Sequence, residues 1–499
     1  MVATCRAGRG VGALGRTRIG STFAVLGVLV LCAVSCTAAT SELGRHAEVR
    51  DPVTGGGGIA APGTDYDYAP LGFQREEFLL AGKAVRYRAK GTPGSDGKWT
   101  AEERTGSAPF TTRVVVVRPS DPSKFNGTVY VEWFNVTGGF DVPVTWTMAH
   151  NEILREGAAF VGVTAQAAGA SPGGLPTSDP ARYGSLAHPG DEYSYDVFSQ
   201  AGAALRDGAS HKALLGDLRA ERVIALGESQ SAAWLATYVN AVHPLAKVFD
   251  GFFLQSRGDE AKQLDQSAFD SPELPFGAGI RADLDEPVIV FQSEYDVQLF
   301  GPDASKQHDS EKVRVWQVAG TSHVDAYTGG LAQQDLGDGS AEQALLDPHK
   351  ASGGVLQCQR PVNAGGQHAV VMAALVDLER WVRDGKAPRH RPRLELSGHP
   401  PTAIARDAHG IALGGIRTPI VDVPLAVNAG DGTNAPATCS YFGTTVPLDR
   451  ATLAALYPRG SADYAERFER AARKAVADGV WLQPEADRFV AAARHISFR

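Results

Sequence analysis

The stretch Arg222-Val-Ile-Ala-Leu-Gly-Glu-Ser-Gln-Ser231 runs from an apolar strand pattern through a tight turn into a helical pattern. Gly227 and Ser231 stand two residues before and after the central Ser229. Small residues are needed at both places because the strand and the helix pass close together, and the central residue adopts a strained backbone conformation. The stretch therefore predicts that Ser229 is a nucleophile at a strand-to-helix turn. Ser231 replaces the more usual Gly, and the alternative role for Ser229 is that of a helix N-cap.

Further apolar runs, separated by helical patterns, lie on both sides of this strand. Such alternation is typical of a mostly parallel sheet with crossover helices. The last six runs lack polar alternation, as expected of strands buried on both faces, and the first two alternate and suit an antiparallel edge. We predict an α/β fold with an eight-stranded, mostly parallel sheet, its strands at residues 78–87, 112–118, 128–134, 158–164, 222–226, 248–254, 287–291 and 314–318.

Helical periodicity predicts the elements that flank this sheet. The clearest helical patterns cover residues 144–156, 195–214, 231–242 and 368–384. From residue 386 onward the sequence has its own Gly, Pro and Asn punctuation, followed by amphipathic stretches at 449–456, 461–478 and 485–495. We therefore expect a core over 66–385 and a C-terminal helical appendage over 386–499 that packs on it.

A general base for Ser229 is expected in the loop after the last strand, which overhangs the carboxyl edge of the sheet. His323 lies in that loop, within Ala319-Gly-Thr-Ser-His-Val-Asp325. Of the 13 histidines, His368 is the main competitor, but it opens a long helical pattern. We predict that His323 is the base.

The imidazole also needs an acid on its other nitrogen, after a strand and between Ser229 and the histidine in chain order. The segment Pro287-Val-Ile-Val-Phe-Gln-Ser-Glu-Tyr-Asp296 fits this position. Asp296 has the usual spacing after the strand, and Glu294 in the same loop is the alternative. We predict Asp296.

Backbone N–H groups are expected to bind the oxyanion of an acyl-transfer intermediate. One is the N–H of Gln230, which follows the nucleophile. The other is expected from the loop after the third predicted strand, Asn135-Val-Thr-Gly-Gly139, where we assign Val136.

The chain resembles a bacterial, actinobacterial-type α/β-hydrolase domain family of largely uncharacterised function. The resemblance covers nearly all of the chain beyond its first segment. It implies an α/β-hydrolase fold and a serine triad of Ser229, His323 and a loop acid, with the C-terminal appendage as part of the same unit. It is carried by the turn at Gly227 and by the segments 131–139, 183–190, 195–200, 320–323 and 414–419.

Three functions are compatible with these residues. The first, and the one we predict, is a serine hydrolase that cleaves a small or medium acyl ester through an acyl-enzyme. The second is an acyltransferase that passes the acyl group to an alcohol of the cell envelope. The third is a non-catalytic, envelope-binding lipoprotein, which the intact Ser, His and acid loops argue against.

The first residues predict export. Residues 1–35 combine a basic stretch and an apolar run of signal-peptide length. Cys36 follows small residues and could be lipidated, which would attach the protein to a membrane; plain signal-peptidase cleavage is the alternative. Residues 36–65 look like a flexible linker. The later cysteines, Cys358 and Cys439, are expected to form a disulfide in an oxidising compartment.

Net charge and the absence of certain motifs argue against nucleic acid, metal ions and other cofactors as partners. The formal net charge is -8 and no long basic run occurs, so binding to nucleic acid is not expected. No ligand-spaced cluster of His, Cys and Asp and no glycine-rich phosphate loop is found, so we expect neither a metal nor another cofactor.

Overall fold

The computed structural model describes residues 47–497, except 61–62, 207, 266–272, 302, 304–305, 349–356, 400–401 and 431–435. Residues Gly44–Arg499 form one compact unit. The predicted signal peptide, Cys36 and the first part of the predicted linker lie outside the described residues.

A nine-stranded sheet organises this unit, in the order β1-β2-β3-β5-β4-β6-β7-β8-β9. In this order the strands from β5 to β9 are parallel to one another, and the pairs β1–β2, β2–β3 and β3–β5 are antiparallel. The mostly parallel α/β fold and its antiparallel edge are therefore confirmed. The strands are β1 Glu48–Pro52, β2 Phe73–Ala89, β3 Ala101–Pro119, β4 Thr128–Trp133, β5 Ala159–Val163, β6 Arg222–Glu228, β7 Gly251–Gln255, β8 Val288–Ser293 and β9 Val313–Val318.

The predicted count of eight strands is wrong by one, because β1 lies inside the segment 36–65 that was predicted as a linker. Its residues are Glu-Val-Arg-Asp-Pro, and four of the five are exposed. β1 is an edge strand that pairs only with β2. Such a strand is held by backbone hydrogen bonds, so its sequence carries no apolar alternation by which it could be recognised.

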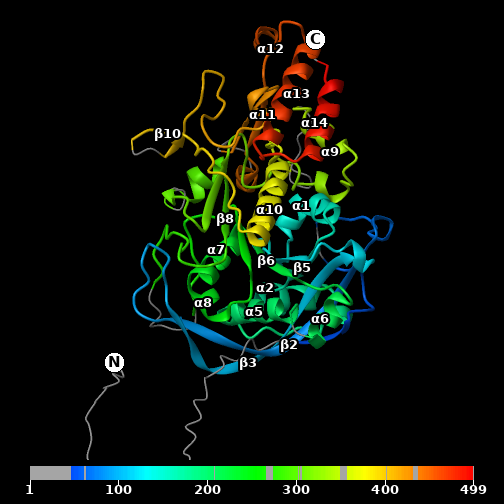
Figure 1. Cartoon of the computed structure of the whole chain (residues 1–499), viewed down its shortest axis with the longest axis vertical. Helices are drawn as coiled ribbons and strands as arrows, with labels where there is room; N and C mark the ends of the chain where they lie inside the picture. The colour runs from blue at the N-terminus through cyan, green and yellow to red at the C-terminus, as the bar shows by residue number, and fades with distance from the viewer. Residues whose placement is uncertain are drawn as a thin grey trace, which may run out of the picture. The chain divides into compact units, whose positions relative to one another are not determined.

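Helices cover both faces of the sheet (Figure 1). Side chains alternate along each central strand: Ile224 and Leu226 of β6 join one apolar cluster, and Val223 and Ala225 join the other. The first cluster includes α1 and α10, and the second includes α5, α6 and α7. These helices are α1 Val144–Arg155, α5 Ser194–Ala204, α6 Gly208–Leu215, α7 Gln230–Thr237 and α10 Gln367–Asp384.

Two predicted helices are divided in the structure. The pattern at 195–214 forms α5 and α6, and α6 begins at Gly208. The pattern at 231–242 begins as α7 and continues as a π-helical turn, Tyr238–Val242. Apolar periodicity persists through such breaks, so it does not reveal them.

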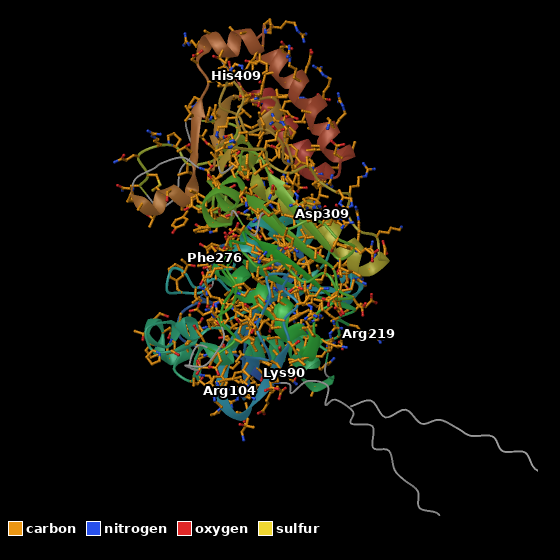
Figure 2. All side chains as sticks on the ribbon, turned by 90° about the vertical axis from the view of Figure 1, so that its left-hand side faces the viewer. Lys90, Arg104, Arg219, Phe276, Asp309 and His409 are labelled. Carbon is orange, nitrogen blue, oxygen red and sulfur yellow. A yellow bond between two sulfur atoms is a disulfide. The ribbon has the colours of Figure 1, made fainter. Side chains whose placement is uncertain are left out.

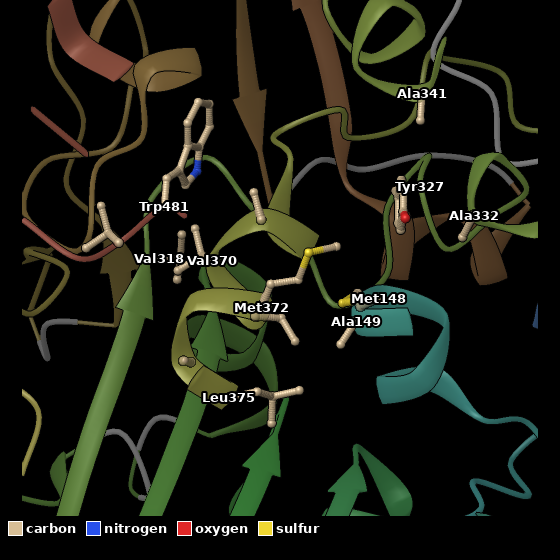
Figure 3. Packing of buried hydrophobic residues seen from close by; sticks show 14 of the residues in the cluster. Met148, Ala149, Val318, Tyr327, Ala332, Ala341, Val370, Met372, Leu375 and Trp481 are labelled. Carbon is tan, nitrogen blue, oxygen red and sulfur yellow. The ribbon is translucent and has the colours of Figure 1, made fainter. Parts of the chain in front are cut away.

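The packing of α1 on α10 forms the centre of the first cluster. Figure 3 shows Met148 and Ala149 of α1 on the side toward which Met372 and Leu375 of α10 point. All four side chains are at most 1% exposed. Full burial of a Met or Leu side chain contributes roughly 1.5–3 kcal/mol to the free energy of unfolding.

The C-terminal region extends the same cluster. Its helices α12 Arg450–Leu456, α13 Ser461–Ala477 and α14 Gln483–His495 match the predicted amphipathic stretches to within two residues. Phe468, Trp481 and Phe489 bury their rings in the cluster that includes α10. Figure 2 shows this region, marked by His409, at the opposite end of the unit from the β2–β3 hairpin that carries Arg104.

Candidate active site

The turn between β6 and α7 holds Ser229 in a strained conformation, with φ 53° and ψ -114°. Among the non-glycine residues of the described ranges, only Lys247 and Ser256 share a positive φ. A Cβ atom at Gly227 would lie 2.9 Å from the carbonyl oxygen of Ser231, so the close approach requires glycine. The predicted strand-to-helix turn is therefore present, and Ser229 stands at its apex, partly exposed.

Ser231, the departure from the usual glycine, has a structural use. Its hydroxyl donates to the carbonyl oxygen of Glu228 at 2.8 Å and accepts from the N–H of the same residue at 2.9 Å. The side chain is fully buried. Ser231 thus stabilises the turn, because its hydroxyl is hydrogen-bonded to both the N–H and the carbonyl oxygen of Glu228.

Three predicted residues come together at the carboxyl edge of the sheet. His323 Nε2 lies 2.7 Å from Ser229 Oγ, and His323 Nδ1 lies 2.6 Å from Asp296 Oδ1. Since a carboxylate can only accept, Nδ1 carries the proton and Nε2 is free to accept from the serine hydroxyl. This arrangement can activate Ser229 as a nucleophile.

Each partner is fixed by the loop that follows its strand. Asp296 follows β8, and its other oxygen, Oδ2, accepts from the Ser293 N–H at 2.7 Å and the Ser293 hydroxyl at 2.8 Å. His323 follows β9. Burial lowers the pKa of His323, but the carboxylates of Asp296 and Glu228 outweigh it, so the pKa lies above its usual value.

Glu294, the alternative acid, has other partners. It is fully buried and accepts from the N–H of Gly320 at 2.5 Å, the N–H of Gly430 at 3.1 Å and Arg406 Nη2 at 2.8 Å. Burial raises its pKa, although Arg406 opposes the shift. Glu294 therefore ties three loops together and does not form the hydrogen bond to His323.

His368, the alternative base, lies inside the α10 cluster. Its ring stacks on Tyr327 at a centroid distance of 3.8 Å, and neither ring nitrogen has a hydrogen-bond partner in the described part of the chain. Burial lowers its pKa to about 3. It serves as a neutral packing group.

A hydrogen bond through the Gln230 side chain joins the two residues predicted to supply the oxyanion donors. Gln230 opens α7, and the N–H of a first helical residue has no acceptor within its helix. The Val136 N–H donates to the side-chain Oε1 of Gln230 at 3.4 Å, and Gln230 Nε2 donates to Gln166 Oε1 at 2.9 Å. A carbonyl oxygen of a substrate must therefore displace the Gln230 side chain to reach Val136.

Aromatic rings line His323, which the sequence analysis did not predict. Phe300 lies 4.8 Å, Tyr295 5.7 Å and Tyr441 5.8 Å from the imidazole, measured between ring centroids. Tyr441 comes from the 3-10 helix Ala437–Phe442, more than a hundred residues later in the chain. No local pattern could have indicated this contact.

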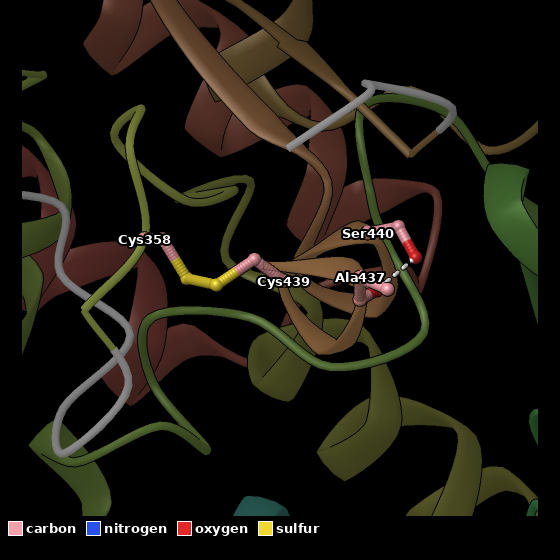
Figure 4. The surroundings of a disulfide bond; sticks show 4 residues. All are labelled: Cys358, Ala437, Cys439 and Ser440. Carbon is pink, nitrogen blue, oxygen red and sulfur yellow. Dashed lines mark hydrogen bonds between the residues drawn. A yellow bond between two sulfur atoms is a disulfide. The ribbon is translucent and has the colours of Figure 1, made fainter. Parts of the chain in front are cut away.

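The segment that carries Tyr441 is held by the disulfide between Cys358 and Cys439, as Figure 4 shows. Two backbone bonds add to it: Val324 donates to Tyr441 at 3.1 Å, and Asn363 donates to Phe442 at 2.8 Å. The predicted disulfide is therefore present, and it connects the C-terminal region to the loop after His323.

Three further observations concern metal binding, membrane spanning and cavities. Within the described ranges, no group of His, Cys, Asp and Glu residues could bind a metal ion. No helix of those ranges is long and apolar enough to cross a membrane. A cavity of about 640 Å³ is lined by Gly139 and Phe140 of the Val136 loop, but Ser229 and His323 do not line it.

A parallel α/β sheet with a serine at the strand-to-helix turn, followed in chain order by an acid and a histidine, defines the class of α/β hydrolases. Residues 49–491 match the model of the alpha/beta hydrolase domain family, and the chain belongs to that family. No curated protein matches the chain.

Solved structures of hydrolases resemble the chain distantly. A putative dienelactone hydrolase from Klebsiella pneumoniae is 14% identical, covering 48% of this chain and 85% of its own, with a TM-score of 0.23. A thermostable esterase from Pseudomonas putida is 13% identical over 43% and 65%, with a TM-score of 0.24. An α/β serine hydrolase without lid, from Xanthomonas campestris, is 12% identical over 49% and 85%, with a TM-score of 0.25.

Proposed function

We propose that this protein is a serine hydrolase that cleaves carboxylic esters of small or medium acyl groups. Ser229 Oγ attacks the ester carbonyl carbon while its proton moves to His323 Nε2. Asp296 holds the imidazole and stabilises its charge, and the proton is then delivered to the departing alcohol. Water then attacks the carbonyl carbon of the acyl-enzyme while its proton moves to His323 Nε2, and that proton returns to Ser229 Oγ as the acid leaves.

One observation carries this proposal: the continuous chain of hydrogen bonds from Ser229 through His323 to Asp296, at 2.7 and 2.6 Å. The nucleophile is partly exposed, whereas the base and the acid are at most 6% exposed. A substrate can therefore reach the serine while His323 and Asp296 stay shielded from water. Their electrostatic interaction is stronger in such a shielded environment than in water.

The oxyanion of the tetrahedral intermediate would be bound by the N–H groups of Gln230 and Val136. Each such donor contributes about 3 kcal/mol of transition-state stabilisation. Since the Val136 N–H is occupied by the Gln230 side chain at rest, substrate binding includes a movement of that amide.

We also propose that the protein works outside the cytoplasm. The disulfide between Cys358 and Cys439 supports this, because such bonds persist in oxidising compartments. In this proposal residues 1–35 supply the export signal, and Cys36 supplies the lipid anchor. Mass spectrometry of the mature protein from its host tests both: the expected N-terminus is Cys36 with a lipid, and an unprocessed N-terminus contradicts export.

The activity is tested with a chain-length series of activated acyl esters and a fluorophosphonate label. The wild type is expected to hydrolyse the shorter esters and to take up one label, and the folded Ser229→Ala variant to do neither. Wild-type protein that is folded yet inert in both assays contradicts the proposal. If an added alcohol collects the acyl group in place of water, the protein is an acyltransferase.

A further inference from the structure

Glu228, the residue before Ser229, is a buried carboxyl group at the end of β6. It is 2% exposed. Its Oε2 accepts from Asn135 Nδ2 at 3.0 Å, and the same Nδ2 lies 3.1 Å from the Glu228 carbonyl oxygen. Asn135 thus fixes the orientation of the Glu228 carboxyl group, because its amide contacts both the side chain and the backbone of Glu228.

The other oxygen, Oε1, is buried and has no hydrogen-bond partner in the part of the chain that the structure describes. It lies 3.6 Å from His323 Nε2, the nitrogen that Ser229 Oγ contacts. A buried carboxylate oxygen without a donor destabilises the folded protein. A positive charge next to this oxygen forms during the reaction, because His323 becomes an imidazolium when Nε2 takes the proton of Ser229.

We propose that Glu228 is a positioning residue that stabilises the protonated imidazole of His323 from the Nε2 side, opposite to Asp296. The proton moves from Ser229 Oγ to Nε2 as the new Oγ–carbon bond forms, and from Nε2 to the alcohol oxygen as the carbon–oxygen bond of the ester breaks. Glu228 gains and loses no proton in either step. It acts through its charge, and the imidazolium is held between two carboxylates.

The charges around this pair are consistent with that role. Burial raises the pKa of Glu228 to about 7, His323 lowers it and Asp296 raises it. Glu132, on the neighbouring strand β4, is a further acidic group that interacts with Glu228. The rings of Tyr295, Phe300 and Tyr441 cover other sides of His323. Glu228 therefore carries its charge above about pH 7 and loses it below.

The inference rests on the proposed function, and its test has a readout that does not need turnover. In Glu228→Gln the side chain keeps its size and an oxygen for Asn135, but it has no negative charge. The pKa of His323, followed by ¹⁵N NMR of the imidazole, is expected to fall by about one unit, the effect of removing a neighbouring charge. The acid limb of kcat/KM is expected to move to lower pH by the same amount, and kcat/KM at pH 8 to drop about tenfold.

Glu132→Gln is the matched control. Glu132 is also buried, and burial raises its pKa to about 8, but its oxygens accept from the N–H groups of Thr145 and Trp146 at the start of α1. The His323 pKa is expected to stay at the wild-type value in this variant. An unchanged His323 pKa in folded Glu228→Gln, or an equal fall in both variants, overturns the role of Glu228. A fall of the His323 pKa in folded Glu228→Gln, together with a wild type that turns over no ester, overturns the proposed function instead.

Discussion

Asp296 and Glu294 are two residues apart and equally buried, yet their hydrogen-bond partners give them different roles. Asp296 meets an imidazole and a serine, and Glu294 meets an arginine and two backbone N–H groups. The sequence could narrow the acid to these two residues, because both follow β8. Only the direction of each side chain separates them, and that direction depends on loops that come much later in the chain.

Exchange of each carboxylate for its amide tests this division. Asp296→Asn is expected to lower kcat by a factor on the order of 10⁴, because an amide favours the wrong tautomer of His323. Glu294→Gln is expected to leave kcat within about tenfold and to lower the free energy of unfolding, by about 3 kcal/mol at most, since Arg406 keeps some exposure. Ester kinetics and urea unfolding measure the two effects, and equal losses of kcat would contradict the assignment.

Ser231 offers a second prediction at this scale. Ser231→Ala removes both hydrogen bonds to the Glu228 backbone, so the buried N–H loses its Ser231 acceptor, while the carbonyl oxygen still accepts from Asn135 Nδ2. The free energy of unfolding is expected to fall by about 1–3 kcal/mol, while the fluorophosphonate still labels Ser229. Thermal unfolding and labelling measure this, with Ser397→Ala as control, because that side chain is exposed and its hydroxyl donates to the Ala403 carbonyl oxygen at 3.5 Å. A Tm equal to that of the wild type would show that Ser231 is not needed at the turn.

At the scale of elements, the sequence predicted what repeats locally and missed what depends on distant partners. The central strands were recognised because both of their faces are buried, which produces long runs of Val, Ile and Phe. Polar β1 was not recognised, since its partner β2 supplies its hydrogen bonds. The triad followed from the order of loops, whereas the contact of Tyr441 with His323 and the burial of Glu228 required the folded chain.

The third prediction concerns the disulfide that holds the segment Ala437–Phe442. Replacing both Cys358 and Cys439 by Ser opens a loop whose ends are 81 residues apart, which is expected to lower the free energy of unfolding by about 4 kcal/mol. Turnover is also expected to fall, because Tyr441 loses its fixed place beside His323. Tyr441→Ala in the intact disulfide background is the control: it should reproduce the loss of turnover with little loss of stability. Wild-type turnover in the variant that lacks both cysteines would show that the disulfide does not hold Tyr441 in a place that catalysis needs.

At the scale of the whole molecule, a buried ion network joins the β2–β3 hairpin to the Val136 loop. Arg113 of β3 contacts Glu77 of β2 at 2.5 Å and Asp141 at 2.9 Å, and all three side chains are at most 1% exposed. Glu77 also pairs with Arg182 at 2.6 Å. Desolvation lowers the pKa of Arg113, and the two carboxylates more than restore it, so the guanidinium stays charged. The edge of the sheet is thereby connected to the active-site loops.

Arg113→Met is expected to reduce the free energy of unfolding by about 3–5 kcal/mol, because buried Asp141 loses the arginine that it pairs with and buried Glu77 keeps only Arg182. Arg88→Met is the control on the same hairpin. Arg88 pairs with Glu102, but its side chain is 56% exposed, so its loss should cost less than about 1 kcal/mol. Denaturant unfolding of both variants measures the difference, and similar costs would show that the buried network contributes no more than a surface pair.

The backbone conformation of Ser229 has an evolutionary consequence. A positive φ at a residue with a side chain costs on the order of 1–3 kcal/mol, which the surrounding strand and helix must offset. Glycine would remove most of that cost and all of the chemistry. Selection for activity therefore keeps a residue that selection for stability alone would replace, and a descendant released from catalysis should drift to glycine at this position. In the laboratory, Ser229→Gly should unfold at a higher temperature than the equally inactive Ser229→Ala.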